Sequence, residues 1–223
     1  MPSFRSCFLF LALLSLAPAQ VATEANKEYQ TREGRERIAK TLDDPQRQER
    51  LKPREMLAVL EIKPGSAVAD VGTGVGAMLP FLVEAVGPSG RVIAEDIQQD
   101  FLDKAEARIK SNAWSNVSTV KGGEKDPNLP ESQIDLAFVF DVYHHFNYPS
   151  DMLGHIARAL KPDGRLAIAD MYRKRRGPQD KDMSNHIRAD RDEVIKEIEE
   201  NGFKLLSYRD HGTNQYVLLF QKK

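Results

Sequence analysis

The chain has 223 residues, which suits one sizeable α/β domain and is short for two. Hydrophobic residues make up 41% and charged residues 29% of the chain, so we expect a folded globule and not a disordered polypeptide. The formal net charge of −1 provides no general attraction to nucleic acid or to an anionic membrane, so neither is an expected partner.

The first 19 residues have the pattern of a cleavable signal peptide. Arg5 gives a short basic start, residues 7–17 form an apolar run that is short for a membrane span, and Ala17-Pro18-Ala19 fits a small-x-small cleavage site. Cleavage would leave Gln20 as the first residue of a periplasmic or secreted protein without stable membrane insertion. The alternative is a chain anchored in the membrane by an uncleaved N-terminal segment.

Residues 20–45 predict a linker followed by a surface helix, ahead of a main domain at residues 46–223. Within that domain, residues 47–60 predict an amphipathic helix that is interrupted or restarted at Pro53. Arg47 in this helix is a candidate to face a site, and a solvated surface charge is the alternative.

The stretch 66–78, SAVADVGTGVGAM, organises the domain. Small and β-branched residues around Asp70 predict a buried strand, and the apolar run after the stretch predicts a helix. Between them, Gly72, Gly74 and Gly76 can take positive φ and let a ligand lie against the backbone near free helix N–H groups. This turn predicts the first unit of a doubly wound sheet. Its G-x-G-x-x-A spacing also admits a dinucleotide, and a turn without a ligand is a further alternative.

A second predicted strand, residues 91–94, is followed by Glu95 and Asp96. Asp96 stands where nucleotide-binding α/β folds place an acidic residue, and a carboxylate can accept from both hydroxyls of a ribose. Glu95 is the competing candidate, and a solvated acidic pair is the alternative without a ligand.

The chain then alternates between predicted helices and strands, at residues 98–112, 116–120, 133–140, 149–160 and 166–169. Directly after the strand 133–140 comes Asp141-Val142-Tyr143-His144-His145-Phe146-Asn147. Because open α/β sheets bind ligands at the carboxyl ends of their strands, we expect this segment at the lip of a site.

The last part of the chain predicts a helix at residues 190–201 and two strands at 203–208 and 215–220. The two strands are separated by a short polar turn, which indicates an antiparallel hairpin. The basic run 173–176 predicts a solvated loop, or alternatively a lip that meets an anionic acceptor.

The D-x-G-x-G-x-G pattern from Asp70 to Gly76 resembles the first motif of the class I S-adenosylmethionine (SAM) methyltransferases. The wider pattern from Lys63 to Asp170, together with the terminal hairpin, is similar to the same family. The Tyr143-His144-His145 sequence resembles a subgroup of predicted bacterial methyltransferases. The resemblance implies a doubly wound, Rossmann-like α/β fold, whose seven-stranded and mostly parallel sheet ends in a C-terminal antiparallel hairpin.

The resemblance also implies how the cofactor is held. In that family the glycine turn cups the methionine half of SAM, and an acidic residue orients its amino group. The implied cofactor-binding residues are Asp70, Gly72, Thr73, Gly74, Gly76, Asp96, Ile97 and Asp141. In the loop after the third strand, Asp126 is the candidate for the adenine amino group and Glu124 the second choice, and a simple Asp-Pro turn is the alternative.

A methyl group leaves the SAM sulfonium by in-line displacement, so the enzyme mainly aligns the nucleophile and excludes water. His144 or His145 would act as a general base for a hydroxyl or an acidic carbon, and Tyr143 would orient the acceptor. For each histidine a structural role at the strand end is the alternative. Two adjacent histidines without further ligands at the usual spacing predict no metal site.

Together these residues predict a SAM-dependent methyltransferase that acts on a small-molecule acceptor. A non-catalytic SAM-binding module is the main alternative, and an NAD(P)-binding oxidoreductase is a weaker one.

If the signal peptide is cleaved, the native protein begins at or near Gln20 and is found outside the cytoplasm, because a basic start and a short apolar run direct export. Cell fractionation with N-terminal sequencing measures both properties. A cytosolic protein that retains residues 1–19 would contradict export, and an uncleaved form in the membrane fraction would support the anchor instead.

Overall fold

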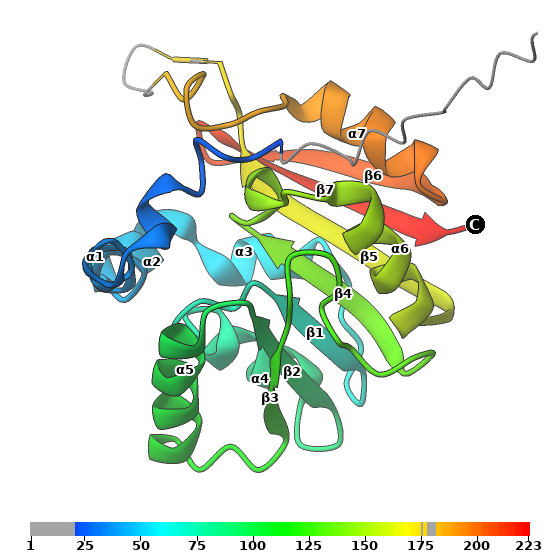
Figure 1. The fold of residues 1–223 in the computed structure, drawn as a ribbon. Helices are drawn as coiled ribbons and strands as arrows, with labels where there is room; N and C mark the ends of the chain where they lie inside the picture. The colour runs from blue at the N-terminus through cyan, green and yellow to red at the C-terminus, as the bar shows by residue number, and fades with distance from the viewer. Residues whose placement is uncertain (1–20, 175, 178–181) are drawn as a thin grey trace, which may run out of the picture.

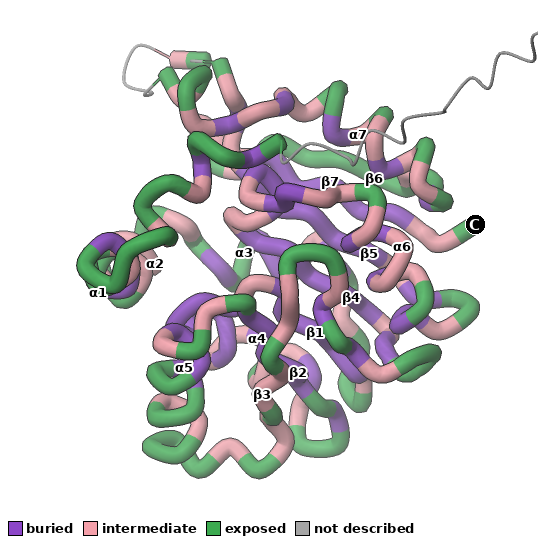
Figure 2. The backbone as a smooth tube through the Cα atoms, viewed as in Figure 1, coloured by how far each residue is buried: buried purple, intermediate pink, exposed green. Residues whose placement is uncertain are grey.

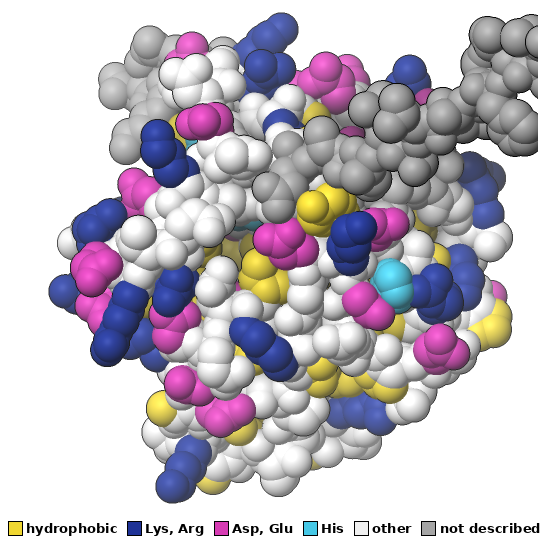
Figure 3. Space-filling view, in the orientation of Figure 1, with side chains coloured by type: hydrophobic (Ala, Val, Ile, Leu, Met, Phe, Trp, Pro, Cys, Tyr) yellow, Lys and Arg dark blue, Asp and Glu magenta, His cyan; other side chains and the backbone are white. Residues whose placement is uncertain are grey.

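The computed structural model describes residues 21–174, 176–177 and 182–223, so the predicted signal peptide and one residue of the basic run lie outside the described residues. None of the helices in the described part of the chain combines the length and the apolar character needed to cross a bilayer. On the face shown in Figure 3, Lys and Arg side chains are interspersed with Asp and Glu side chains, so neither sign dominates the face in view.

A seven-stranded sheet forms the centre of the fold, in the order β3-β2-β1-β4-β5-β7-β6 (Figure 1). The strands are β1 (Ala67–Val71), β2 (Arg91–Asp96), β3 (Val117–Lys121), β4 (Ile134–Phe140), β5 (Leu160–Met171), β6 (Phe203–His211) and β7 (Gln215–Lys222). β1 to β5 pair in parallel, and β7 is antiparallel to both β5 and β6. The prediction of a mostly parallel, Rossmann-like sheet with a C-terminal antiparallel hairpin is confirmed.

The strand order reverses at β1, which pairs with β2 on one side and with β4 on the other. The chain runs outward from β1 to β2 and β3 and then returns to place β4 on the other side of β1, so a crevice forms between the loops that follow β1 and β4. Open α/β sheets bind their ligands at this switch point.

Helices cover both faces of the sheet (Figure 1). The helices are η1 (Lys27–Gln30), α1 (Arg32–Leu42), α2 (Pro45–Leu51), α3 (Pro53–Ala58), α4 (Leu79–Val86), α5 (Gln99–Ser111), η2 (Tyr143–His145), α6 (Pro149–Ala159) and α7 (Arg191–Glu200). The predicted interruption at Pro53 is present: Lys52 takes a φ of +45°, and Pro53 then begins α3 without needing an N–H donor.

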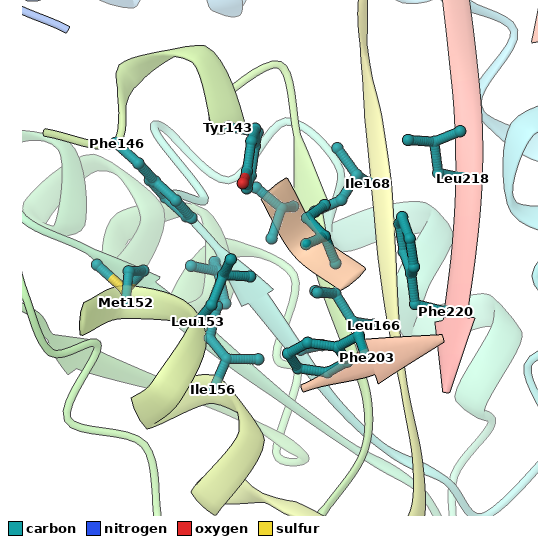
Figure 4. Packing of buried hydrophobic residues seen from close by; sticks show 14 of the residues in the cluster. Tyr143, Phe146, Met152, Leu153, Ile156, Leu166, Ile168, Phe203, Leu218 and Phe220 are labelled. Carbon is teal, nitrogen blue, oxygen red and sulfur yellow. The ribbon is translucent and has the colours of Figure 1, made fainter. Parts of the chain in front are cut away.

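Alternating side chains of the central strands form two hydrophobic cores, one on each face of the sheet. One set of strand side chains points toward α3, α4 and α5: Val68, Val92, Ala94, Leu136, Phe138 and Ala167. Toward α6 and α7 point Ala69, Val71, Ile93, Ala137, Val139, Leu166 and Ile168. Figure 4 shows α6 packed on this second face, and Figure 2 shows that buried residues follow the central strands. Burial on both faces explains why these strands are continuously apolar.

Strand β5 begins earlier than the sequence predicts. The predicted turn 161–165 lies within β5, because Leu160 already pairs with Ile134 of β4 and pairing resumes at Leu136 and Arg165. The intervening residues form an irregularity in the register and not a separate turn. Strand β6 likewise extends to His211, so the connection to β7 is shorter than predicted.

Replacing the fully buried Leu153 of α6 by alanine is expected to lower the free energy of unfolding by roughly 2–5 kcal/mol, because it leaves a cavity in the core. Leu206→Ala is the matched control, since Leu206 is 46% exposed and should change stability by no more than about 0.5 kcal/mol. Urea denaturation measures both values, and equal effects would contradict the described packing.

Candidate active site

A cavity lies at the carboxyl ends of β1, β2 and β4, where the strand order reverses. Its wall is built from the glycine turn after β1, the acidic residues at the end of β2 and the segment after β4. The N-terminal elements η1, α1 and α2 complete the wall. Residues far apart in the sequence therefore meet at one site.

The glycine turn has the backbone conformation that its residue types predict. Gly72, Gly74 and Gly76 have φ values of +74°, +57° and +76°, which side chains rarely allow. Gly72 and Gly74 line the cavity, whereas Gly76 does not. A Cβ on Gly76 would lie 2.7 Å from Cδ1 of Leu79. This glycine therefore allows α4 to pack closely and is not part of the cavity wall.

Asp70 and Thr73 line the cavity on either side of the first glycine. Asp70 is 2% exposed, and its Oδ2 accepts a hydrogen bond from the Thr73 hydroxyl at 2.7 Å. Burial raises the pKa of Asp70 to about 7, because the hydroxyl only partly compensates for lost hydration. This carboxylate would be stabilised by a cationic ligand.

Both acidic residues at the end of β2 line the cavity and are buried. Asp96 accepts from the backbone N–H of Gly74 at 2.8 Å and from that of Gln98 at 2.7 Å. Glu95 accepts from Gly72 N–H at 3.1 Å through Oε2, while its Oε1 has no hydrogen-bond partner among the described residues. Burial raises the pKa of Asp96 to about 6 and places that of Glu95 well above its usual range.

Asp141 follows β4 with a φ of +58° and turns its carboxylate into the cavity wall. Its Oδ2 is 2.7 Å from Arg47, whose guanidinium also lies 5.6 Å from the centre of the Phe140 ring. The other oxygen, Oδ1, is buried with no partner among the described residues. Burial raises the pKa of Asp141 even though the Arg47 charge opposes this. Arg47 is therefore a wall residue and not a solvated charge.

The loop after β3 differs from its prediction. Ile97 and Phe101 both line the cavity, and these apolar side chains suit a flat ring. Asp126 is not in the wall, because its carboxylate is held 3.0 Å from Nε2 of His155 on α6. Glu124, the second choice for the adenine contact, lines the cavity instead.

Tyr143 does not face the cavity. Its side chain is 1% exposed and packs among core residues with Phe146 and Leu153 (Figure 4). Its hydroxyl donates to Glu197 on α7 at 2.6 Å, and Arg188 pairs with the same carboxylate. Tyr143 therefore joins η2 to α7, which leaves no hydroxyl for the predicted orientation of an acceptor.

The two adjacent histidines have different surroundings. His144 is 3% exposed, lies outside the cavity wall and places Nδ1 2.8 Å from Asp170. Burial opposes protonation of His144, but the Asp170 charge raises its pKa overall. His145 lines the cavity, and burial together with the two neighbouring imidazoles holds its pKa well below the usual range. Of the three predicted catalytic residues, only His145 reaches the cavity.

Sequence analysis missed the contribution of the N-terminal segment. Asn26, Tyr29 and Leu42 line the cavity, and the Tyr29 ring packs edge-on against His145 with centroids 4.8 Å apart. The signal was present in the spacing of apolar residues: Tyr29, Ile38 and Leu42 pack against a cluster that contains Phe101. The segment predicted as a linker and surface helix therefore also covers the site.

Comparison with known proteins shows similarity to methyltransferases in both sequence and structure. Residues 69–166 match a family described as a methyltransferase domain. The crystal structure of a SAM-dependent methyltransferase from Aquifex aeolicus has a TM-score of 0.78 to this fold at 28% identity, and the match covers 83% of this chain and 97% of that one.

Among curated proteins, a Streptomyces fradiae protein named "Uncharacterized 37.1 kDa protein in transposon TN4556" is 34% identical over 115 residues, which is 52% of this chain and 33% of that protein. Nocamycin O-methyltransferase of Saccharothrix syringae is 30% identical over 115 residues, which is 52% of this chain and 41% of that protein. The chain thus spans less than half the length of these curated relatives.

The fold and the cavity are those of an α/β protein with a ligand site at the switch point of its sheet. The match of residues 69–166 to a methyltransferase domain and the structural likeness to a SAM-dependent methyltransferase support a class I SAM-dependent methyltransferase with SAM as its cofactor.

The residues present fit SAM. Buried acceptor atoms that have no hydrogen-bond partner within the described part of the chain lie in the wall on Glu95, Asp141 and Asn147. SAM carries the matching donors, namely an ammonium group, ribose hydroxyls and an adenine amino group. Since buried polar atoms are normally paired, these acceptors indicate a ligand with several donors.

The prediction that Asp96 receives the ribose is tested by Asp96→Asn. Loss of hydrogen bonds to a charged group is expected to weaken SAM binding by roughly 1.5–3 kcal/mol, or about 10- to 100-fold, as measured by calorimetry. Asp126→Asn is the matched control, because Asp126 lies outside the cavity wall and should leave SAM affinity unchanged. Weaker SAM binding in Asp126→Asn, with unchanged binding in Asp96→Asn, would assign the ligand contact to Asp126 instead.

The same titration has a pH signature. The pKa values of Asp70 and Asp96 lie near 7 and 6, above the usual 3.8, so both carboxyls take up protons as the pH falls through this window. SAM carries a net positive charge and favours the carboxylates, so its affinity should rise from pH 5.5 to pH 8. Asp96→Asn should reduce this dependence of SAM affinity on pH. A SAM affinity that does not change with pH in the unmodified protein would contradict the prediction.

Proposed function

We propose that this chain transfers the methyl group of SAM to a small-molecule acceptor. The observation that carries the proposal is the set of buried, unpaired acceptor atoms around a glycine turn at the switch point of the sheet. A binding site of this kind fixes a cationic, donor-rich ligand, and an apolar wall beside it excludes water.

When bound, SAM supplies a methyl group already activated on a sulfonium. The contribution of the chain is therefore binding and alignment. Asp70 and Asp141 provide negative charge for the cationic cofactor, and Asp96 accepts from the ribose. Ile97 and Phe101 provide the apolar surface for the adenine ring.

The acceptor side of the cavity is assigned to the wall formed by His145, Asn147 and the N-terminal segment. His145 is uncharged at neutral pH because its pKa is lowered by burial and by its imidazole neighbours. Its Nδ1 lies 2.9 Å from Asn26 Oδ1, so Nδ1 carries the proton and Nε2 keeps a lone pair. His145 is therefore proposed as the general base, a role for which the sequence offered both His144 and His145.

The acceptor is proposed to be a small molecule because residues of the N-terminal elements form part of the wall of the cavity and limit the room beside the cofactor. Nocamycin O-methyltransferase, similar to this chain over residues of the core domain, carries an O-methyl transfer in its name. A hydroxyl acceptor is accordingly the first class to test. Export of the mature chain is a separate proposal, supported by the basic start, apolar run and cleavage pattern of the first 19 residues.

Purified protein is expected to release labelled methyl groups from SAM to at least one member of a panel of phenols, alcohols, thiols, amines and carboxylic acids. Gly74→Val should abolish SAM binding and turnover together, because Gly74 has a φ of +57° and a Cβ would lie 2.9 Å from Leu42. His145→Gln should keep SAM binding while turnover falls.

Calorimetry with SAM and the labelled-methyl assay separate the outcomes. SAM binding without turnover of any acceptor class would support the non-catalytic binding module. Absence of SAM binding, with binding of NAD or NADP instead, would sink the proposal.

A further inference from the structure

Three of the five histidines of the chain come together behind the cavity wall, although sequence spacing gave no sign of it. His144 and His145 follow β4, and His186 arrives from the segment before α7. One ring nitrogen from each lies within 4.8 Å of the others. The sequence predicted no metal site because it showed only the adjacent pair.

The arrangement of the rings matches imidazoles around one ion. The ring centroids are 4.1 Å apart for His144 and His145, 5.0 Å for His144 and His186, and 5.3 Å for His145 and His186. Tetrahedral coordination with metal–nitrogen bonds of about 2.0–2.1 Å places imidazole centroids roughly 5 Å apart. Two pairs already have this spacing, and the third needs only a small opening.

The second nitrogens of two rings are anchored as in metal-ligating histidines. Nδ1 of His144 lies 2.8 Å from the carboxylate of Asp170, and Nδ1 of His145 lies 2.9 Å from the amide oxygen of Asn26. A carboxylate or amide oxygen at Nδ1 fixes the tautomer and orients Nε2 as a ligand. The Tyr29 hydroxyl is 3.5 Å from Nε2 of His145, which is long for a hydrogen bond.

The charges around the cluster also suit a cation. Asp141 and Asp170 lie beside His144, and these three residues offer a second set of converging ligand atoms. The positive charge of Arg188 also acts on His144 and opposes the effect of these two carboxylates.

We infer that His144, His145 and His186 bind one divalent transition-metal ion, with Zn²⁺ the best match to three imidazole ligands and an open fourth position. Because His145 lines the cavity, the ion would lie next to the wall where the acceptor is expected. Asp170 and Asn26 act as positioning residues through the ring nitrogens that they hold. Metal binding requires no SAM and can be tested apart from methyl transfer; while the ion is bound, the Nε2 lone pair of His145 is a ligand, so His145 does not act as a base in that form.

The experiment uses mature protein without a histidine tag, stripped with a chelator and titrated with Zn²⁺ alone by calorimetry. One equivalent is expected to bind, and Co²⁺ should give the visible absorption of a tetrahedral site. His186→Gln should weaken Zn²⁺ binding by at least 100-fold. Asp170→Asn should weaken it by about 10- to 100-fold, as expected for a residue that orients a ligand.

His155→Gln and His211→Gln are matched controls, since these histidines contact Asp126 and the Leu51 carbonyl oxygen and belong to neither set of converging ligand atoms in the described residues. Both controls should bind Zn²⁺ like the unmodified protein. Thermal unfolding without metal shows that each variant is folded, and Zn²⁺ should raise the melting temperature only where His144, His145 and His186 are intact. Binding of less than one-tenth of an equivalent, or unchanged affinity in folded His186→Gln, would overturn the inference.

Discussion

Negative charge buried at the carboxyl ends of three parallel strands is the constraint on which the site depends. Asp70 lies in β1, Asp96 ends β2 and Asp141 follows β4. Asp70 and Asp96 are buried and Asp141 is partly buried by the helices and loops around them. Burial raises the pKa of all three, so the site holds ionised carboxylates at an energetic cost. A ligand with positive charge and several donors removes that cost. The same constraint explains why backbone N–H groups of the glycine turn are directed at Asp96 and Glu95.

The sheet could be predicted because each of its features is local. The alternation of apolar runs, the three glycines and the terminal polar turn each specify a nearby element, and parallel order follows from the crossover helices. The start of β5 was missed because its pairing with β4 depends on a register irregularity at Ile134, which has no local pattern. The same limit applies to Asp126, where the sequence shows an acidic residue in the right loop but not its contact with His155.

The residues after β4 show where sequence reasoning on a site stops. Tyr143, His144 and His145 are consecutive, and their chemistry gives no reason to prefer one of them. The short η2 helix turns their side chains in different directions: Tyr143 into the core, His144 toward Asp170 and His145 toward the cavity. Distant partners on α7, on β5 and in the N-terminal segment decide this, and they are identified by tertiary structure alone.

The N-terminal segment links the cofactor side of the cavity to its acceptor side. Leu42 contacts the glycine turn, and Arg47 pairs with one oxygen of Asp141. The side-chain amide of Asn26 holds His145 twice: its nitrogen donates to the His145 carbonyl oxygen, and its oxygen contacts Nδ1 of the ring. These contacts belong to elements outside the doubly wound sheet, and each satisfies a polar or apolar group that the sheet itself leaves exposed. The cavity wall is built partly by the strand ends and partly by the N-terminal segment. Substitutions in η1 and α1 can therefore alter the proposed acceptor side while the strand ends keep the cofactor contacts. The position of His145, between Asn26 and the other two imidazoles, therefore makes the N-terminal segment part of any chemistry at this wall.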